Sequence, residues 1–559
     1  MTPVKSTFIE SRSTWFLLAL LVITFIPFLG LTDFYTKGEP REAVVALSML
    51  KSGDWVLPVS NGTDIPYKPP MLAWIIACFS WVAGGVTEFT SRLPSALAVI
   101  IMTVAGYSVC CRYRGAREAM LMALVTVTSF EVHRAGTNCR VDMLLTMFMV
   151  TAIYRMFDSF QRRGSILSIV SVLLLSGGVL TKGPVGAILP LGVMWVFMLI
   201  RGAGFWRATW ECALMFAGSL LIPALWYWAA YQRGGKEFLD LAMEENIGRF
   251  TGTMSYESHV NPWYYNVITV ISGMAPYTLL LLIGAPLIIR GYRRKTAFSF
   301  DAIRRTDPWV LLMWVTVLLI FIFYCIPSSK RSVYLLPIYP MLAYGTGRFI
   351  MALWKRGQTA LNIYSCLIAV LAVVTPLLFT ALAIFYTPDV ATKTGRTIAG
   401  MQQYAASAPV AVYMTFIVSI AAGIMLLQNL RHHNRTAFML FATLAIYWSF
   451  SAVYQPAALR SKSNTAVIAS VSQYPELYSW CEDSMLRFYS IDFALGDRIT
   501  PLRSLPDREI LFLVGDRDFE AMKGRYEAGF TFETVTDYQE KSCDVGQRIL
   551  LVKSKPKTL

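Results

Sequence analysis

Long apolar stretches recur along this chain from Trp15 to Phe450, and they restrict the folds that it can adopt. Many of them run for roughly 18–20 residues, which is long enough to cross the hydrocarbon core of a bilayer. Inside a bilayer the backbone must pair its own N–H and C=O groups, so these stretches are predicted to be helices. Only 15% of the 559 residues are charged and the mean hydropathy is +0.50, which is typical of a membrane-embedded protein.

Short clusters of basic residues separate the apolar stretches and indicate their orientation, because such clusters stay on the cytoplasmic side of a membrane. The net charge of +15 is therefore explained by topology, and no nucleic-acid partner is expected. About thirteen spans and an external C-terminus follow if residues 71–86 lie along the outer interface without crossing. That segment is short, follows two prolines and contains Gly84 and Gly85.

The predicted fold class is an α-helical integral membrane protein with a small C-terminal α/β domain. Residues 1–455 are expected to form the transmembrane domain, with an external catalytic loop at residues 33–70 and the interfacial helix at residues 71–86. From about residue 461 the composition becomes mixed and polar, so residues 456–559 are expected to form an external domain.

Within the external domain, alternation and helical periodicity predict a few elements. Residues 516–528 are a predicted helix, and the predicted strands are residues 485–491, 509–514 and 548–552. Cys481 and Cys543 also lie in this domain, where an oxidising compartment would allow them to form a disulfide.

The loop at residues 33–70 is the first long polar interruption of the apolar pattern. Residues 39–50 are predicted to form a helix within it, because acids begin the segment and Ala43, Ala46, Leu47 and Leu50 share one helical face. Gly53 is expected to end this helix. Glu39 would then lie at a helix N-terminus, where free backbone N–H groups favour an anion.

Seven short motifs occur in a fixed order along the chain. They are GEPREA at residues 38–43, SGDW at 52–55, YKPPM at 67–71, SRLPSA at 91–96, RVDML at 140–144, TKGP at 181–184 and SKRSVYLLP at 329–337. Together they resemble the aminoarabinose transferase and protein O-mannosyltransferase superfamily of integral-membrane glycosyltransferases, over residues 15 to about 350. The resemblance implies the GT-C fold, an external active site and a sugar donor linked to a polyprenyl phosphate such as undecaprenyl phosphate.

A donor of this class brings one phosphate to the membrane surface, and cations would hold that phosphate as it leaves the sugar. Seven residues are candidates for this role by motif and topology: Lys68, Arg92, Arg140, Lys182, Lys330, Arg331 and Tyr334. The alternative for the cations is contact with lipid headgroups, and for Tyr334 a place in the interfacial aromatic belt. Arg92 could instead fix the loop.

Two positions depart from the pattern of the superfamily. Gly38 stands where aspartate is usual, and Tyr67 stands where a metal-binding glutamate is frequent. Glu39 and Asp142 remain as candidate catalytic acids beside Lys68, although Glu39 could be a helix-start charge and Asp142 a buried partner of Arg140.

A divalent metal is possible but not required by the sequence, and no other cofactor is predicted. His259 matches the other ligand position of the superfamily only loosely, and a lone histidine binds a metal weakly.

The resulting hypothesis is a glycosyltransferase of the bacterial inner membrane with its active site on the periplasmic side. A lipid A-type glycolipid is the favoured acceptor, because an acceptor phosphate is already anionic and needs no base. A protein Ser or Thr, served by Glu39, is the alternative acceptor.

Two other classes of protein remain open, a transporter of lipid-linked sugars and a non-catalytic partner in polymer assembly. Transporters usually place ionisable groups near the midplane of the membrane, whereas the charges of this chain lie between the apolar stretches.

Overall fold

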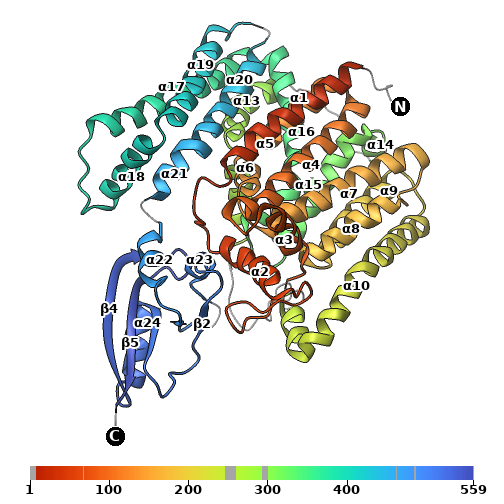
Figure 1. The fold of residues 1–559 in the computed structure, drawn as a ribbon. Coiled ribbons are helices and arrows are strands. Elements are labelled where there is room, and N and C mark those ends of the chain that lie inside the picture. The colour runs from red at the N-terminus through yellow and green to blue at the C-terminus, as the bar shows by residue number, and fades with distance from the viewer. Residues whose placement is uncertain are drawn as a thin grey trace.

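The computed structural model describes residues 8–66, 68–245, 260–291, 300–432, 434–460, 463–483 and 486–557. The described chain is mainly helical, with one small sheet domain at its C-terminal end (Figure 1).

The first half of the helical part contains α1 (Phe8–Phe25), η1 (Ile26–Phe28), α2 (Glu39–Ser52), α3 (Met71–Ala83), α4 (Glu88–Arg114), α5 (Ala116–Val127), α6 (Phe130–Gly136), α7 (Val141–Arg163), α8 (Ile169–Lys182), α9 (Val185–Ile200) and α10 (Phe205–Met243). The second half contains α12 (Tyr265–Gly273), α13 (Tyr277–Gly291), α14 (Phe300–Arg304), α15 (Pro308–Cys325), η3 (Ser332–Ile338), α16 (Tyr339–Arg356), α17 (Gln358–Phe385), α18 (Lys393–Ser407), α19 (Pro409–Gln428), α20 (Arg435–Ser449), η4 (Phe450–Tyr454) and α21 (Gln455–Leu459).

Seven helices of the described chain are long and apolar enough to cross a membrane, and the bent pair α12–α13 forms an eighth candidate. Four further apolar helices have 10–17 residues. The chain is therefore a multi-pass membrane protein, as its sequence indicates, while the count of about thirteen spans stays a prediction. The last apolar helix runs past residue 455 to Leu459 before the sheet domain begins.

Helix α2 confirms the helix predicted within the polar loop. It begins at Glu39 and ends at Gly53, whose φ of 71° lies in the left-handed region that glycine adopts without steric cost. Ala43 and Ala46 of the predicted apolar face are buried, and Leu50 packs partly buried against the same core. Val44 and Met49 are buried as well, whereas Leu47 is half-buried.

Helix α3 occupies most of the segment that is predicted to lie along the membrane. It has 13 residues and ends at Gly84, so it spans only about 20 Å, less than the ~30 Å hydrocarbon core. It packs against α2 and α4. Its orientation along the interface stays a prediction.

The C-terminal domain contains α22 (Thr465–Val471), β1 (Leu477–Trp480), α23 (Tyr489–Ala494), β2 (Ile499–Pro501), β3 (Ile510–Gly515), α24 (Asp516–Tyr526), β4 (Phe530–Lys541) and β5 (Arg548–Pro556). The sheet has the order β2-β1-β3-β5-β4, in which β2, β1 and β3 are parallel and β5 and β4 are antiparallel. Helices α22 and α23 pack on one face of the sheet and α24 on the other.

The expected strands at residues 509–514 and 548–552 are confirmed as parts of β3 and β5, and the helix expected at residues 516–528 as α24. The strand expected at residues 485–491 is wrong, because α23 begins at Tyr489 and no strand occupies residues 486–491. Phe488, Ile491 and Leu495 follow helical spacing and share one buried cluster. Strands β1 and β2 are too short to show clear alternation. All nine cysteines, Cys481 and Cys543 included, are free thiols.

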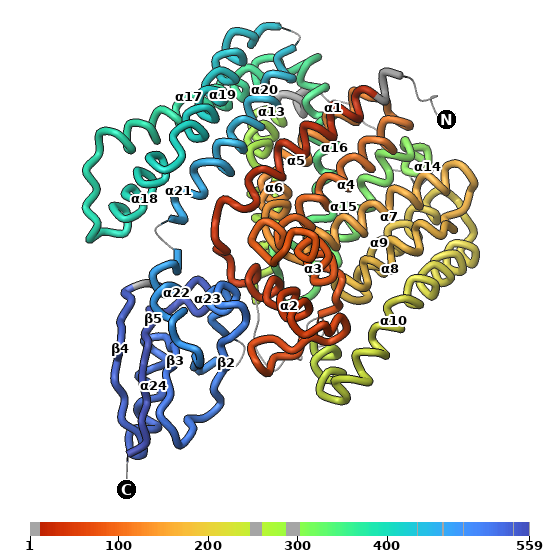
Figure 2. The backbone as a smooth tube through the Cα atoms, viewed as in Figure 1, coloured from red at the N-terminus to blue at the C-terminus, as the bar shows by residue number. Residues whose placement is uncertain are grey.

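The C-terminal domain docks on the polar loop through Asp497. Its carboxylate accepts hydrogen bonds from Ser48 Oγ at 2.6 Å and from the backbone N–H of Asn61 at 2.7 Å. An ion pair of 2.9 Å between Arg487 and Asp64 adds a second contact. The loop, α2 and the sheet domain therefore lie together at one end of the molecule, beside the last turns of α10 (Figures 1 and 2).

Candidate active site

Glu39 and Arg92 form a buried ion pair that holds the start of α2. The carboxylate is 0% exposed and lies 2.9 Å from Arg92 Nε. Its two oxygens also accept hydrogen bonds from the backbone N–H groups of Tyr35 and Cys139. The remaining nitrogens of Arg92 donate to backbone carbonyls of the chain between α1 and α2. The structure therefore gives both residues the structural role that the sequence left open for them, enclosed within the protein.

Lys68 pairs with Glu42, one turn after Glu39 on α2, and not with Glu39 itself. The side chains of Lys68 and Glu42 are 20% and 14% exposed, and Arg41 lies 3.9 Å from the same carboxylate oxygen. Burial, followed by the charge of Arg41, lowers the pKa of Lys68 to about 8. The neighbouring cations, Lys68 above all, outweigh burial and lower the pKa of Glu42. The pair is thus ionised at neutral pH.

A second ion pair joins Asp142 at the start of α7 to Lys182 at the end of α8. Lys182 Nζ lies 2.5 Å from the carboxylate and 4.3 Å from the centre of the Tyr334 ring. Tyr334 stacks on Tyr324 with 5.3 Å between ring centres. Three of the predicted residues are therefore in contact, although their motifs lie far apart in the sequence.

Arg140 lies between these two groups of charges. Burial and the nearby charge of Arg331 lower the pKa of Arg140, and the charge of Arg140 acts on Glu42 as well as Asp142. Among the described residues no ion pair joins Arg140 or Arg331 to a carboxylate, and the buried Nε of Arg140 has no hydrogen-bond partner. Two neighbouring guanidinium groups without paired carboxylates favour an anion.

Gly38 makes room for this arrangement. A Cβ atom at residue 38 would lie 3.0 Å from Cζ of Arg140, so the guanidinium occupies the space of a side chain there. The departure from aspartate at this position thus removes an acid and leaves Arg140 without a carboxylate beside it.

Lys330 contacts backbone carbonyls, whereas Lys68 and Lys182 pair with carboxylates. It is 6% exposed, and its amine donates to the backbone carbonyls of Asn261 and Pro327. His259 lies outside the described residues. Within the described part of the chain, no group of three or more His, Cys, Asp or Glu residues is placed to hold a metal.

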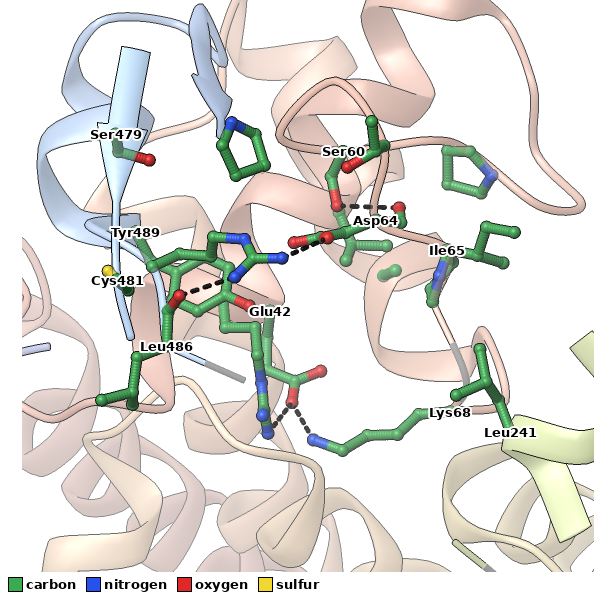
Figure 3. A pocket seen from close by; sticks show the side chains of 18 of the residues that line it. Glu42, Ser60, Asp64, Ile65, Lys68, Leu241, Ser479, Cys481, Leu486 and Tyr489 are labelled. Carbon is green, nitrogen blue, oxygen red and sulfur yellow. Dashed lines mark hydrogen bonds and ion pairs between the residues drawn. The ribbon is translucent and has the colours of Figure 1, made fainter. Parts of the chain in front are cut away.

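A cavity of about 700 Å³ opens beside the Lys68–Glu42 pair. The polar loop, α3, the end of α10 and the sheet domain all line it, and Figure 3 shows Lys68 and Glu42 pointing toward one another at one side. Apolar residues of α3 and α10 face the cavity, among them Leu72, Trp226 and Leu241. A polar ion pair therefore adjoins an apolar surface.

Glu42 and the cavity residues of the C-terminal domain were not among the site residues predicted from the sequence. Glu42 belongs to the quoted motif at residues 38–43, and its spacing of one helical turn from Glu39 is the signal that could have found it. The residues of the C-terminal domain come within reach only through a fold that brings positions more than 400 apart together, as in the contact of Ser48 with Asp497.

Known proteins resemble this chain both in sequence and in fold. A family model described as dolichyl-phosphate-mannose-protein mannosyltransferase matches residues 67–228. An uncharacterized protein of Aquifex aeolicus (strain VF5) is 28% identical over 343 residues, which are 60% of this chain and 64% of that protein.

The undecaprenyl phosphate-alpha-4-amino-4-deoxy-L-arabinose arabinosyl transferase of Edwardsiella ictaluri (strain 93-146) is 26% identical over 363 residues. That match covers 62% of this chain and 61% of the relative, so the chain spans less than two thirds of the length of these curated relatives.

Among solved structures, the crystal structure of ArnT from Cupriavidus metallidurans bound to undecaprenyl phosphate superposes with a TM-score of 0.72. The match has 19% sequence identity and covers 97% of this chain and 98% of that one. The helices and the C-terminal domain thus have the GT-C fold. In sequence the chain is similar to the aminoarabinose transferases and, over residues 67–228, to the protein mannosyltransferase family, as its motifs indicate.

Proposed function

We propose that this protein is a glycosyltransferase that moves a sugar from a polyprenyl phosphate to an acceptor at the periplasmic face of a bacterial inner membrane. The observation that carries the proposal is the pair Arg140 and Arg331, close to one another and without a carboxylate partner among the described residues. Lys68 and Lys182 flank them, each with one carboxylate. This excess of positive charge suits a phosphate.

The transfer breaks the bond between C1 of the sugar and the phosphate oxygen, and the acceptor oxygen forms the new bond to C1. The lipid phosphate leaves with the bonding electrons and gains negative charge, which preorganised cations stabilise. Arg140, Arg331, Lys68 and Lys182 supply that charge in the proposed reaction, and Tyr334 keeps Lys182 in place through its ring.

Glu42 is a better candidate than Glu39 for the group that faces the acceptor. It lines the cavity, whereas the oxygens of Glu39 are occupied by Arg92 and backbone donors. A carboxylate whose pKa is lowered is a weak base, so Glu42 suits an acceptor that is already anionic. Asp142 orients Lys182 in this scheme.

A phosphorylated glycolipid of the lipid A type is the favoured acceptor. The name of the Edwardsiella ictaluri relative, an arabinosyl transferase that uses undecaprenyl phosphate, supports the donor class. A protein acceptor is the second candidate, and the mannosyltransferase model that matches residues 67–228 favours it.

The test is sugar transfer in membranes that contain equal amounts of each variant, with polyprenyl-phosphate sugars and either lipid A or protein acceptors. Lys68→Ala is expected to lower the rate by about 10²–10³, because it removes a cation beside the leaving phosphate. Lys236→Ala, which removes an exposed charge from α10, serves as the control. Transfer that is unaffected in Lys68→Ala would refute the phosphate role. If the wild-type protein transfers no sugar, the alternatives are a transporter of lipid-linked sugars and a non-catalytic assembly partner. A flipping assay distinguishes these two.

A further inference from the structure

The part of the cavity that the C-terminal domain supplies lies at the ends of two parallel strands. β1 pairs in parallel with both β2 and β3. Residues at and just after the carboxyl ends of β1 and β2, from Trp480 to Glu482 and from Pro501 to Arg503, line the cavity. In open sheets of this kind, ligands bind at the carboxyl ends of parallel strands. The domain therefore turns its binding edge toward the cavity.

The cations on this edge differ in how far their charge is already neutralised. Arg487 pairs with Asp64, and Arg525 pairs with Glu482 while lying 5.9 Å from the centre of the Trp480 ring. Arg503 follows β2, is exposed, and has no ion pair or hydrogen bond from its side chain to a described residue. Among the described cations that line the cavity, Arg503 is the one available for an added anion.

The cavity thus has three chemically distinct sides. Lys68 and Glu42 lie on α2 and the loop that follows it, and Leu72 and Leu241 supply apolar surface from α3 and α10. Arg503 lies on the sheet domain, which Figure 3 places across from α10. A molecule with an apolar part, a reactive group and a separate anionic group matches this arrangement. The donor has a single phosphate. In the proposed function that phosphate is already bound by Arg140, Arg331, Lys68 and Lys182.

We propose that the C-terminal domain forms the acceptor subsite, in which Arg503 binds an anionic group, a phosphate monoester, on the saccharide headgroup of a glycolipid. The inference rests on the proposed function and adds the residue that selects the acceptor. Trp480 and Tyr526, in edge-to-face contact at 5.7 Å, give the same edge the aromatic surface on which sugar rings pack. A protein Ser or Thr acceptor would leave Arg503 without a counter-charge.

The experiment compares Arg503→Ala, Arg503→Glu and Arg503→Lys in the full-length protein, with purified lipid A carrying two phosphates and the same lipid carrying one, so that a phosphate remains to accept the sugar in both. The KM for the acceptor with two phosphates is expected to rise about tenfold in Arg503→Ala and further in Arg503→Glu, because one charged hydrogen bond is lost or reversed. Arg503→Lys keeps the charge and is expected to stay within a fewfold of wild type. The kcat and the KM for the donor stay constant.

Arg517→Ala is the matched control, because Arg517 is an exposed arginine of the same domain that does not line the cavity. An unchanged acceptor KM in Arg503→Glu, or an equal rise for the lipid with one phosphate, would overturn the inference. A second measurement, the binding of lipid A to the detergent-solubilised protein, distinguishes failure of the subsite from failure of the proposed function. Binding that depends on Arg503 in a protein without transfer activity would reject the proposed function and keep the subsite, whereas transfer that is indifferent to Arg503 rejects the subsite alone.

Discussion

At the scale of single residues, the ionisation of Lys68 sets a limit on the pH range of the reaction. Burial and the charge of Arg41 lower its pKa to about 8, so the amine loses its charge as the pH rises through that value. The kcat/KM for the donor is therefore expected to fall by about tenfold per pH unit above pH 8.

Lys68→Arg keeps a charged group beside Glu42 across this range and is expected to abolish the decline, even if its rate at pH 7 is lower. The measurement is the pH profile of transfer with saturating acceptor. A wild-type rate that stays level between pH 7.5 and 9.5 would show that the charge of Lys68 is dispensable.

Gly38 gives the second prediction at this scale. An aspartate there would lie against Arg140, where its carboxylate could pair with the guanidinium group. Gly38→Asp is therefore expected to raise the KM for the donor, because it neutralises a cation of the proposed phosphate site.

Gly38→Ala separates the charge from the volume of the new side chain. The φ of Gly38 is −96°, which alanine adopts without strain, so only the close contact with Arg140 is added. Equal effects of the two substitutions on donor KM would contradict an electrostatic cause.

The motifs predicted Asp142 and Lys182 for one site, and the structure places them in contact, Asp142 at the start of α7 and Lys182 at the end of α8. The motifs did not separate Glu39 from Glu42, because both acids lie one turn apart on the same helix and only packing decides which one meets Arg92. The local sequence therefore does not show which of the two acids pairs with Arg92.

At the scale of elements, α23 contains an acid whose protonation is linked to stability. Asp492 is 1% exposed, and burial followed by the charge of Asp497 raises its pKa to about 7. The unfolded chain has the ordinary value of about 4. The protonated acid therefore contributes stability that is fully present below pH 4 and is lost as the pH rises through 7.

Asp492→Asn imitates the protonated acid and keeps an oxygen for the N–H groups of Arg498 and Ile499. It is expected to raise the melting temperature at pH 8 by on the order of 5 °C and to leave it nearly unchanged at pH 4. Thermal unfolding of the solubilised full-length protein checks this. A gain of the same size at both pH values would contradict the linkage.

Elements with strong local signals were predictable from sequence. Helix α2 has an acidic start and a terminal glycine, and β3 and β5 are continuous apolar runs in the centre of the sheet. β2 has only 3 residues, and its pairing with β1 depends on the rest of the sheet, so no local pattern could reveal it.

At the scale of the whole molecule, the C-terminal domain, the loop before α3 and the end of α10 share one end of the fold (Figure 1). The basic clusters of the sequence predict that this end lies outside the cytoplasm, which is the side expected for the proposed transfer. A reporter that is active only in the periplasm, fused after Lys555, is expected to be active in cells.

The control for the topology is the same reporter inserted between Arg162 and Arg163, which is expected to be silent because these residues follow a span on the cytoplasmic side. If a reporter that works only in the cytoplasm is active after Lys555, the predicted orientation of the chain is wrong. The loop at residues 33–70 would then not be external.

The architecture of apolar helices followed by a separate α/β domain was predictable because hydropathy and composition change clearly along the chain, whereas the external side of that domain stays a prediction. The docking of that domain on α2 was not predictable, since it depends on single polar contacts between distant residues such as Asp497 and Asn61.

The place of β5 in the sheet has a consequence for the biosynthesis of the protein. β5 lies between β3 and β4, so the sheet cannot form until the ribosome has translated β5. The membrane helices of the described chain all precede β5 and are translated earlier, when the cavity still lacks the side that the sheet domain supplies. A chain cut before β5 is therefore expected to keep its membrane helices and to lose that side of the cavity.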